Sequence, residues 1–256
     1  MKNIPLPIVR KKKLVIFDLD KTLAESKQPM DDEMAKLVRG LLDHTKVAVI
    51  SGGSFKQFQV QFVPKLTSGN LGQLSLFPTC GSAFYRFEDG EWHNVYTELL
   101  SPEEKARIFR AFEDMFLEVG FFRPEKIYGE LIEDRSAQVT FGAYGSTAPL
   151  ALKEAWDPDR HKRLKMIDVL KRFIPDFEIR TGGTTSIDVT RKGIDKAHGI
   201  HQMVKHLGIA KEDMVFVGDD LEEEGNDFPV IATGVDVIPV ENVEHTKKLI
   251  RSIIQI

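Results

Sequence analysis

Three short apolar runs, each followed directly by polar residues, constrain the fold of this chain more than any other feature. The runs are residues 14–17, 47–50 and 214–217, followed by Asp18, by Ser51 and by Gly218-Asp219-Asp220. A short apolar run without alternation is typical of a strand buried on both faces, as in a parallel sheet covered by helices. The polar residues are therefore expected to meet at the carboxyl edge of that sheet, where ligands of open α/β sheets bind.

Helical segments follow the first run and precede the third. Apolar residues recur at helical spacing from about residue 31 to residue 42 and from 196 to 207, and Gly208 is a suitable C-terminal cap. Strand, helix and strand in succession indicate βαβ units. The two ends of the chain are therefore predicted to form halves of one α/β domain, a Rossmann-like core with a parallel sheet.

The middle of the chain has a different pattern. Ser101-Pro102-Glu103-Glu104 is a capping box with proline at the first helical position, and a second helix is expected over 157–173. Polar and apolar residues alternate over 138–144 and 184–189, as in antiparallel strands with one solvated face. We therefore predict an inserted α+β domain with an antiparallel sheet. The predicted boundaries are 1–90 and 190–256 for the core and 91–189 for the insert.

The composition excludes several classes of protein. An apolar fraction of 42% excludes a disordered chain, and a net charge of −4 argues against a nucleic-acid partner. The single cysteine, Cys80, excludes an intrachain disulfide and a thiolate zinc site. Because no apolar run approaches the roughly 18 residues of a membrane span, we expect no membrane association and a cytoplasmic location.

Asp18 and Asp20 are the first candidate catalytic residues. Two carboxylates so close together repel each other unless a cation or a shared proton relieves the repulsion. One interpretation makes Asp18 a nucleophile that attacks phosphorus and Asp20 the acid that protonates the leaving oxygen and then the base that activates water. A purely structural interpretation, a helix N-cap beside a solvated carboxylate, also fits the spacing.

Ser51 and Lys196 extend this candidate site. Ser51-Gly52-Gly53 ends the second strand ahead of a helical stretch, where a hydroxyl and backbone N–H groups suit a phosphate oxygen. Lys196 opens the late helix and could pair with Asp18 and with the phosphate. A simple Gly/Ser turn and a solvated lysine are the structural alternatives.

The acidic residues after the third strand suit a hard divalent cation. Magnesium binds carboxylate and carbonyl oxygens while keeping several waters. Asp219, Asp18 and the backbone carbonyl of Asp20 are expected to hold Mg²⁺. Asp227 is expected to help organise these ligands without binding the ion directly. Asp18, Asp20, Asp219 and Asp227 are therefore the predicted metal residues.

These four motifs, in this order, resemble those of the haloacid dehalogenase-like phosphotransferase superfamily, in its subclass with a large α/β cap between the second and third motifs. The chain is most similar to the eukaryotic-type phosphomannomutases and their bacterial relatives. The segments that carry this likeness are residues 50–54, 132–135, 182–189, 193–196 and 225–227. The resemblance implies that Arg135, Ser186 and Asp188 contact a sugar phosphate from the cap, and that two chains can pair through the cap as a homodimer.

The chain also departs from the phosphomannomutase pattern. Lys27 stands where the family has an arginine, which keeps the charge but loses the bidentate fork. Ser146 and Lys153 occupy the positions of two further arginines that grip the distal phosphate in the family. A mutase must hold its bisphosphate intermediate while that intermediate reorients between two phosphate transfers. Losing these arginines weakens that hold, so water can attack the aspartyl phosphate instead.

The sequence therefore predicts a magnesium-dependent phosphohydrolase of a small phosphorylated sugar, with Lys27, Gly52, Gly53, Arg135, Ser186 and Asp188 binding the substrate. Phosphomannomutase, which interconverts hexose 1- and 6-phosphates, is the alternative. A non-catalytic sugar-phosphate sensor is a second alternative, although a binding protein gains nothing from a nucleophile.

Overall fold

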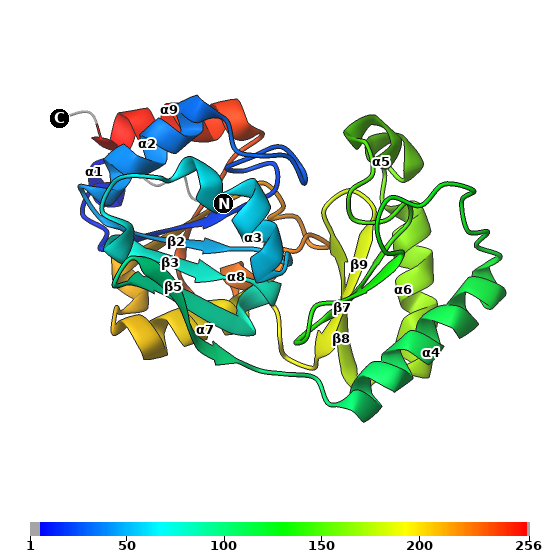
Figure 1. Cartoon of the computed structure of the whole chain (residues 1–256). Coiled ribbons are helices and arrows are strands. Elements are labelled where there is room, and N and C mark those ends of the chain that lie inside the picture. Colours follow the sequence, from blue (N-terminus) through cyan, green and yellow to red (C-terminus); the bar gives the residue numbers. More distant parts are fainter. Residues whose placement is uncertain (1–5, 255–256) are drawn as a thin grey trace. The chain divides into compact units, whose positions relative to one another are not determined.

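The computed structural model describes residues 6–254, which form two compact units, each with its own sheet (Figure 1). The larger unit contains the chain up to Thr97 together with the residues from Asp195 onward. The smaller unit is the continuous segment Glu98–Ile194. None of the helices in 6–254 is long and apolar enough to cross a bilayer.

The larger unit is built on a seven-stranded sheet. Five neighbouring strands pair in parallel, and two further strands are added at one edge by antiparallel pairing. Phe17 of the central strand is paired with Val49 on one side and Val217 on the other, so the three neighbouring strands end side by side. In sheet order the strands are β11 (Asp236–Pro239), β10 (Met214–Gly218), β1 (Leu14–Asp18), β2 (Lys46–Ile50), β3 (Leu74–Phe77), β4 (Ala83–Glu88) and β5 (Glu91–Thr97).

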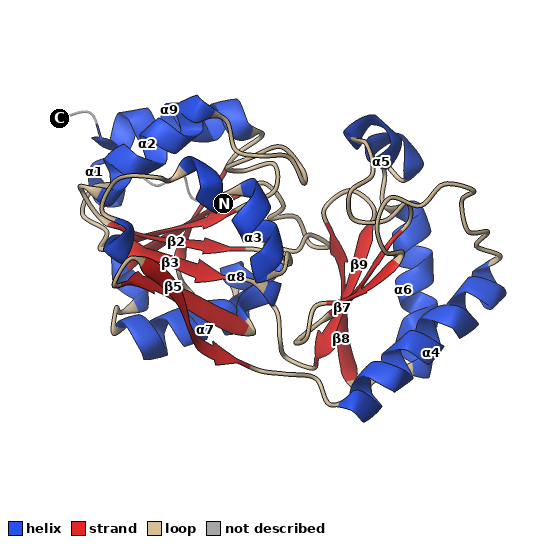
Figure 2. Cartoon of the chain, in the orientation of Figure 1, coloured by secondary structure: helices blue, strands red, loops and turns tan. Residues whose placement is uncertain are grey.

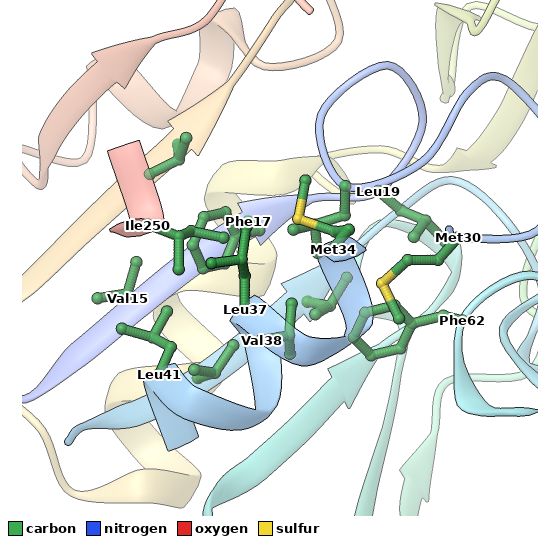
Figure 3. Close-up of a cluster of buried hydrophobic side chains, with 14 of the residues drawn as sticks. Val15, Phe17, Leu19, Met30, Met34, Leu37, Val38, Leu41, Phe62 and Ile250 are labelled. Carbon is green, nitrogen blue, oxygen red and sulfur yellow. The ribbon is translucent and has the colours of Figure 1, made fainter. Parts of the chain in front are cut away.

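Helices cover both faces of this sheet (Figure 2). Alternate residues of β1 point to opposite faces, so Val15 and Phe17 join one apolar cluster and Leu14 and Ile16 another. Figure 3 shows the first cluster, in which Phe17 packs among residues of α2 and α9. The second cluster includes residues of α7. The helices of this unit are α1 (Leu6–Val9), α2 (Asp32–Leu42), α3 (Phe55–Gln61), α7 (Lys196–Leu207), α8 (Phe228–Ile231) and α9 (Val243–Ile254), with short 3-10 turns at Val63–Lys65, Leu71–Gln73, Thr79–Gly81 and Lys211–Asp213.

The smaller unit is an antiparallel sheet with helices packed on one face. Val139 and Ile187 face the apolar core with α4 and α6, whereas the alternate residues Thr140 and Asp188 lie on the opposite face. In sheet order the strands are β6 (Ile132–Asp134), β7 (Val139–Gly142), β9 (Ser186–Arg191) and β8 (Phe177–Gly182); the helices are α4 (Pro102–Val119), α5 (Leu150–Trp156) and α6 (His161–Phe173). The predicted fold class, a parallel-sheet core with an inserted antiparallel α+β domain, is confirmed.

The helix α4 shows how the sequence sets an element's ends. The Ser101 side chain accepts a hydrogen bond from the Glu104 N–H, and the Glu104 carboxylate accepts one from the Ser101 N–H at 2.6 Å. The helix ends at Gly120, which adopts a left-handed conformation with φ of 68°. The capping box therefore forms as the spacing predicts.

The boundaries of the insert differ from the sequence prediction. Strand β5, which the prediction placed in the insert, pairs with β4 in the large sheet. The turn at Asp89-Gly90 has positive φ at both residues, as a type I′ hairpin turn requires, and it joins β4 to β5 within the larger unit. At the other end β9 continues to Arg191, so the smaller unit extends to Ile194 rather than to residue 189.

Candidate active site

The carboxyl end of β1 places two carboxylates in the larger unit. Asp18 is the last residue of the strand and is 3% exposed. Asp20 follows in the next turn, and Lys21 beside it has a left-handed φ of 63°. The purely structural alternative for this pair, an N-cap of a helix, does not apply, because α2 begins at Asp32 and is capped by Asp31.

Lys196 lies at the centre of a buried ionic cluster. It is the first residue of α7, whose N-cap Asp195 accepts a hydrogen bond from the His198 N–H at 3.1 Å. Its Nζ donates to Asp18 Oδ1 at 2.5 Å, to Asn226 Oδ1 at 3.1 Å and to Asp227 Oδ1. Burial alone would lower the pKa of Lys196, but the charges of Asp18 and Asp227 outweigh it and raise that pKa. Lys196 is therefore a fixed cation and not a solvated lysine.

Asp227 is held in place from two directions. Besides Lys196, it accepts a hydrogen bond from the Asp220 N–H to Oδ2 at 3.0 Å. Its carboxylate lies so close to Gly218 that a Cβ there would come within 2.3 Å of Asp227 Oδ2. Only glycine at the end of β10 allows this approach.

Three carboxylates converge in this cluster. One oxygen of each of Asp18, Asp219 and Asp227 lies within 4.8 Å of the others. Thr22 Oγ1 donates to Asp219 Oδ1 at 3.4 Å. The donor atoms are all oxygens, which fits a hard divalent cation such as Mg²⁺.

The charges of these carboxylates affect one another. Burial, followed by the charge of Asp227, raises the pKa of Asp219 to about 7. Burial also raises the pKa of Asp18 well above its ordinary value, with contributions from Asp227 and Asp219 that the charge of Lys196 opposes. The cluster therefore carries more negative charge than Lys196 balances, and a bound cation would relieve it.

Asp20 faces a different set of partners. Lys27 Nζ donates to Asp20 Oδ2 at 2.7 Å and to Gln57 Oε1 at 3.0 Å. Gln57 Nε2 donates to Gln61 Oε1 at 2.7 Å, and Gln61 Nε2 donates to Asp20 Oδ1 at 2.8 Å. The four side chains thus close a ring of hydrogen bonds that joins Asp20 to α3.

This ring determines the charge of Asp20. Burial alone would raise the pKa of Asp20, but the charge and hydrogen bonds of Lys27, with the hydrogen bond from Gln61, lower it to about 2. Asp20 is therefore ionised near neutral pH. Its carboxylate is turned toward Lys27 and Gln61, outside the group formed by Asp18, Asp219 and Asp227.

The loop after β2 is held by the Ser51 side chain and by the backbone of the 3-10 turn that follows β3. Ser51 is 2% exposed, and its Oγ accepts a hydrogen bond from the Gly53 N–H at 3.0 Å. The Thr79 N–H donates to the Gly53 carbonyl and the Cys80 N–H to the Ser51 carbonyl, both at 2.9 Å. This loop, which includes Gly52, leads into α3, so the phosphate-loop candidate and the Asp20 ring share one element.

The remaining candidates lie in the smaller unit. Arg135 is buried and donates to Glu133 Oε2 at 2.9 Å and 2.7 Å, and it lies 4.0 Å from Asp188 Oδ1. Asp188 Oδ1 also accepts a hydrogen bond from Thr140 Oγ1 at 2.8 Å. Ser186 begins the same strand, β9. The structure therefore brings Arg135 and Asp188 together and places Ser186 two residues away along the strand.

Among the residues missed by the sequence analysis are three that bond directly to Lys196 or belong to the ring around Asp20. Asn226 lies next to Asp227 within a motif that was noted, and its amide oxygen accepts a hydrogen bond from Lys196. Gln61 is 2% exposed beside buried Phe58 and Phe62, so a polar residue on an apolar helix face was the available signal. Gln57 gives no such signal, because its role depends on Lys27, which lies 30 residues away.

Comparisons with known proteins identify the family of this chain. The sequence model of the haloacid dehalogenase-like hydrolases matches residues 15–232. A curated relative, the phosphomannomutase of Encephalitozoon cuniculi, is 26% identical over 229 residues, which cover 86% of this chain and 84% of the relative.

Two solved structures share the fold. The IMP-bound, N-terminally truncated IMP-nucleotidase of Plasmodium falciparum superimposes with a TM-score of 0.69 at 17% identity, covering 97% of this chain and 70% of that one. A haloacid dehalogenase-like hydrolase from Bacteroides thetaiotaomicron gives 0.61 at 15% identity, covering 95% and 100%. Together with the family match, these relatives confirm the prediction of an enzyme of the phosphatase type. The chain belongs to the haloacid dehalogenase-like hydrolases.

Proposed function

We propose that this protein is a magnesium-dependent phosphohydrolase that acts on small phosphorylated sugars through a phosphate ester of Asp18. The observation that carries the proposal is the environment of Asp18, a buried carboxylate held by Lys196 through one oxygen. Its second oxygen is the proposed nucleophile, and Asp20 lies two residues away as the proposed acid and base.

The proposed reaction has two steps. The free oxygen of Asp18 attacks phosphorus, the bond from phosphorus to the sugar oxygen breaks, and the leaving oxygen takes a proton from Asp20. Water then attacks the phosphorus of the aspartyl phosphate and gives a proton to Asp20. The bond between phosphorus and the Asp18 oxygen breaks, so that phosphate leaves and the Asp18 carboxylate is restored. Asp20 thus acts first as acid and then as base.

Asp20 must be protonated before the first step. With a pKa of about 2, it carries a negative charge in the structure. A phosphate dianion bound beside it adds like charge and raises that pKa, so we expect proton uptake to accompany substrate binding. Lys27, released in part from Asp20 by that proton, is then available to the phosphate.

The proposed magnesium residues are Asp18, Asp219 and the backbone carbonyl of Asp20. Asp227 is better suited to orient Lys196, because both of its oxygens already accept hydrogen bonds. When bound, Mg²⁺ neutralises charge on the carboxylates and on the phosphate. Ser51, Gly52 and Gly53 are proposed to bind the remaining phosphate oxygens.

Arg135, Ser186 and Asp188 are proposed to select the leaving group. The Arg135 guanidinium has only N–H donors, whereas the Asp188 carboxylate, which already accepts a hydrogen bond from Thr140, has acceptor oxygens. Such a pair can donate to and accept from sugar hydroxyls. This part of the proposal follows the family resemblance and the proximity of Arg135 to Asp188.

The residues that replace family arginines favour hydrolysis over transfer of the phosphate between positions of the sugar. Ser146 carries no charge, and Lys153 is buried with its Nζ donating to the Ser146 carbonyl at 3.1 Å. This protein therefore holds a distal phosphate less tightly than the family arginines would. Phosphomannomutase remains the second candidate, because the curated relative from Encephalitozoon cuniculi carries that name.

An assay pair separates these candidates. Phosphate release is measured across hexose 1- and 6-phosphates with and without Mg²⁺, and isomerisation is followed with hexose 1,6-bisphosphate added. The proposal expects magnesium-dependent release with little isomerisation, and Asp18→Asn should abolish release while keeping ligand binding. Efficient isomerisation with little free phosphate would establish the mutase, whereas binding without either reaction would establish a sensor.

Three further expectations stay predictions. They are a cytoplasmic location, the absence of a nucleic-acid partner, and a homodimer formed through the smaller unit.

A further inference from the structure

A buried ion pair in the smaller unit lies outside all the residues assigned so far. Arg163, on α6, donates from Nε to Asp157 Oδ2 at 2.8 Å. The Arg163 side chain is 3% exposed and that of Asp157 is fully buried. Arg163 is therefore too deeply buried to grip a substrate directly, and its role must lie in what it holds.

Asp157 is itself fixed by the start of α6. The residue at the N-cap position, Arg160, makes no side-chain capping bond. Asp157 replaces it, because its carboxylate accepts hydrogen bonds from the Lys162 N–H at 2.8 Å and the Arg163 N–H at 3.2 Å. One carboxylate thus caps the helix and orients the guanidinium.

The other side of the guanidinium holds the turn between β8 and β9. Arg163 Nη1 donates to the Gly183 carbonyl at 2.9 Å and to the Gly182 carbonyl at 3.4 Å. A planar guanidinium with several fixed donors can bind two successive carbonyls, which an ammonium group does less well. The pair therefore connects the rigid start of α6 to this turn.

The turn leads directly to the proposed substrate residues. Gly182 pairs with Ser186, the first residue of β9. A Cβ at Gly182 would come within 2.5 Å of Asp188 Oδ2, so the Asp188 carboxylate lies directly against the last residue of β8, where the turn begins. A shift of the turn would move Ser186 and Asp188 together.

We infer that Asp157 and Arg163 form a positioning pair, which holds the β8–β9 turn and thereby sets Ser186 and Asp188 in the geometry that selects the leaving group. Selection of a leaving group rests on the proposed function, whereas immobilisation of the turn does not. The choice of charged residues is itself informative. A buried ion pair gives little net stability over apolar residues of the same size, so its use here fits a demand for fixed geometry.

Two measurements test the inference with three variants and a control. Arg163→Met removes the charge and the fork, Arg163→Lys keeps only the charge, and Asp157→Asn removes the partner charge. Arg123→Met is the control, because Arg123 forms an exposed ion pair with Glu113 at 2.5 Å in the same unit. Amide hydrogen exchange is followed over 181–188 and, as an internal reference, over α4. The second measurement is kcat and KM for the best hexose phosphate and for p-nitrophenyl phosphate, which lacks a sugar.

In Arg163→Met we expect exchange in the turn to rise about tenfold or more while α4 is unchanged. The ratio of kcat/KM for the hexose phosphate to that for p-nitrophenyl phosphate should fall about tenfold, mainly through KM. Arg163→Lys should be intermediate and Arg123→Met should resemble the wild type. If Arg163→Met does not fold, Arg163→Lys and Asp157→Asn decide by the same criteria.

If the folded variants exchange amide hydrogens in the turn at the wild-type rate, the inference is wrong. Equal losses for both substrates would also overturn it, because they would indicate general damage. If the wild-type protein hydrolyses no hexose phosphate, the proposed function fails. Faster exchange in the turn would then still support its immobilisation, while the role in selection would be refuted.

Discussion

The ammonium group of Lys196 donates to Asp18 and Asp227, and Asp219 lies close to both of these carboxylates. Burial raises the pKa of Asp18 and that of Asp219, and the charge of Asp227 raises both further. A group whose pKa is higher in the folded state than in the unfolded state stabilises the folded protein when the group is protonated. Its contribution is complete below the unfolded pKa and is lost as pH rises through the folded pKa.

Asp219 should therefore make the metal-free protein less stable as pH rises. Its pKa is about 7 in the folded protein against 3.8 ordinarily. Between pH 5.5 and 8.5 we expect the free energy of unfolding to fall by about 2 kcal/mol through this group. Urea unfolding with a chelator present measures the change. Asp219→Asn is the control and should lose this component, and an identical pH dependence in the variant would contradict the assignment.

Lys27 and Asp20 form the opposite case, a lowered pKa. The stabilisation by ionised Asp20 is present above the ordinary pKa of 3.8 and is lost as pH falls through about 2. At pH 7, Lys27→Met and Asp20→Asn should show a coupling free energy of about 1–3 kcal/mol in a double-mutant cycle followed by urea unfolding. Strictly additive effects would show that the ion pair contributes nothing to stability.

At the scale of elements, the end of β10 controls the position of Asp227. In Gly218→Ala the new Cβ would lie 2.3 Å from Asp227 Oδ2, so the carboxylate must move away from Lys196 and from the Asp220 N–H. We expect a loss of at least about tenfold in turnover, with the protein still folded by circular dichroism.

Gly40→Ala is the matched control for this substitution. A Cβ at Gly40, in α2, would meet its nearest neighbour, a methyl group of Ile254, at an ordinary 3.5 Å. It should leave turnover unchanged and stabilise the helix by about 0.5–1 kcal/mol. Wild-type turnover in Gly218→Ala would contradict the demand for close approach of Asp227.

The elements that the sequence predicted are those whose pattern is local. The buried strands near residues 14, 47 and 214 and the helix Lys196–Leu207 follow from apolar runs and caps. Strand β5 was assigned to the wrong unit because an exposed edge strand carries little apolar pattern. Likewise, the ring around Asp20 depends on contacts between distant side chains, which periodicity does not encode.

At the scale of the whole molecule, the smaller unit has the features of an independent domain. It is the continuous segment Glu98–Ile194, with its own apolar core between α4, α6 and the sheet. Near its two ends Arg191 donates to Glu104 at 2.8 Å and 2.7 Å, which joins the start of α4 to the end of β9. These features predict that it can be separated from the larger unit.

A polypeptide of residues 98–194 should therefore fold without the remainder of the chain. We expect a cooperative thermal transition and dispersed amide resonances, because a domain of about 100 residues can bury its own core. Arg191→Ala should lower the midpoint without abolishing the transition. Absence of any cooperative transition in the isolated segment would show that its core needs the larger unit.

The covalent phosphate on Asp18 is the central claim, and one measurement tests it directly. In Asp20→Asn, p-nitrophenyl phosphate still provides a leaving group that needs little protonation, but the second step lacks its base. With Mg²⁺ present we predict a burst of p-nitrophenol equal to the enzyme concentration. Mass spectrometry of the acid-quenched protein should locate one phosphate on the peptide that contains Asp18. A phosphate on another residue, or turnover without any covalent phosphate, would contradict the account.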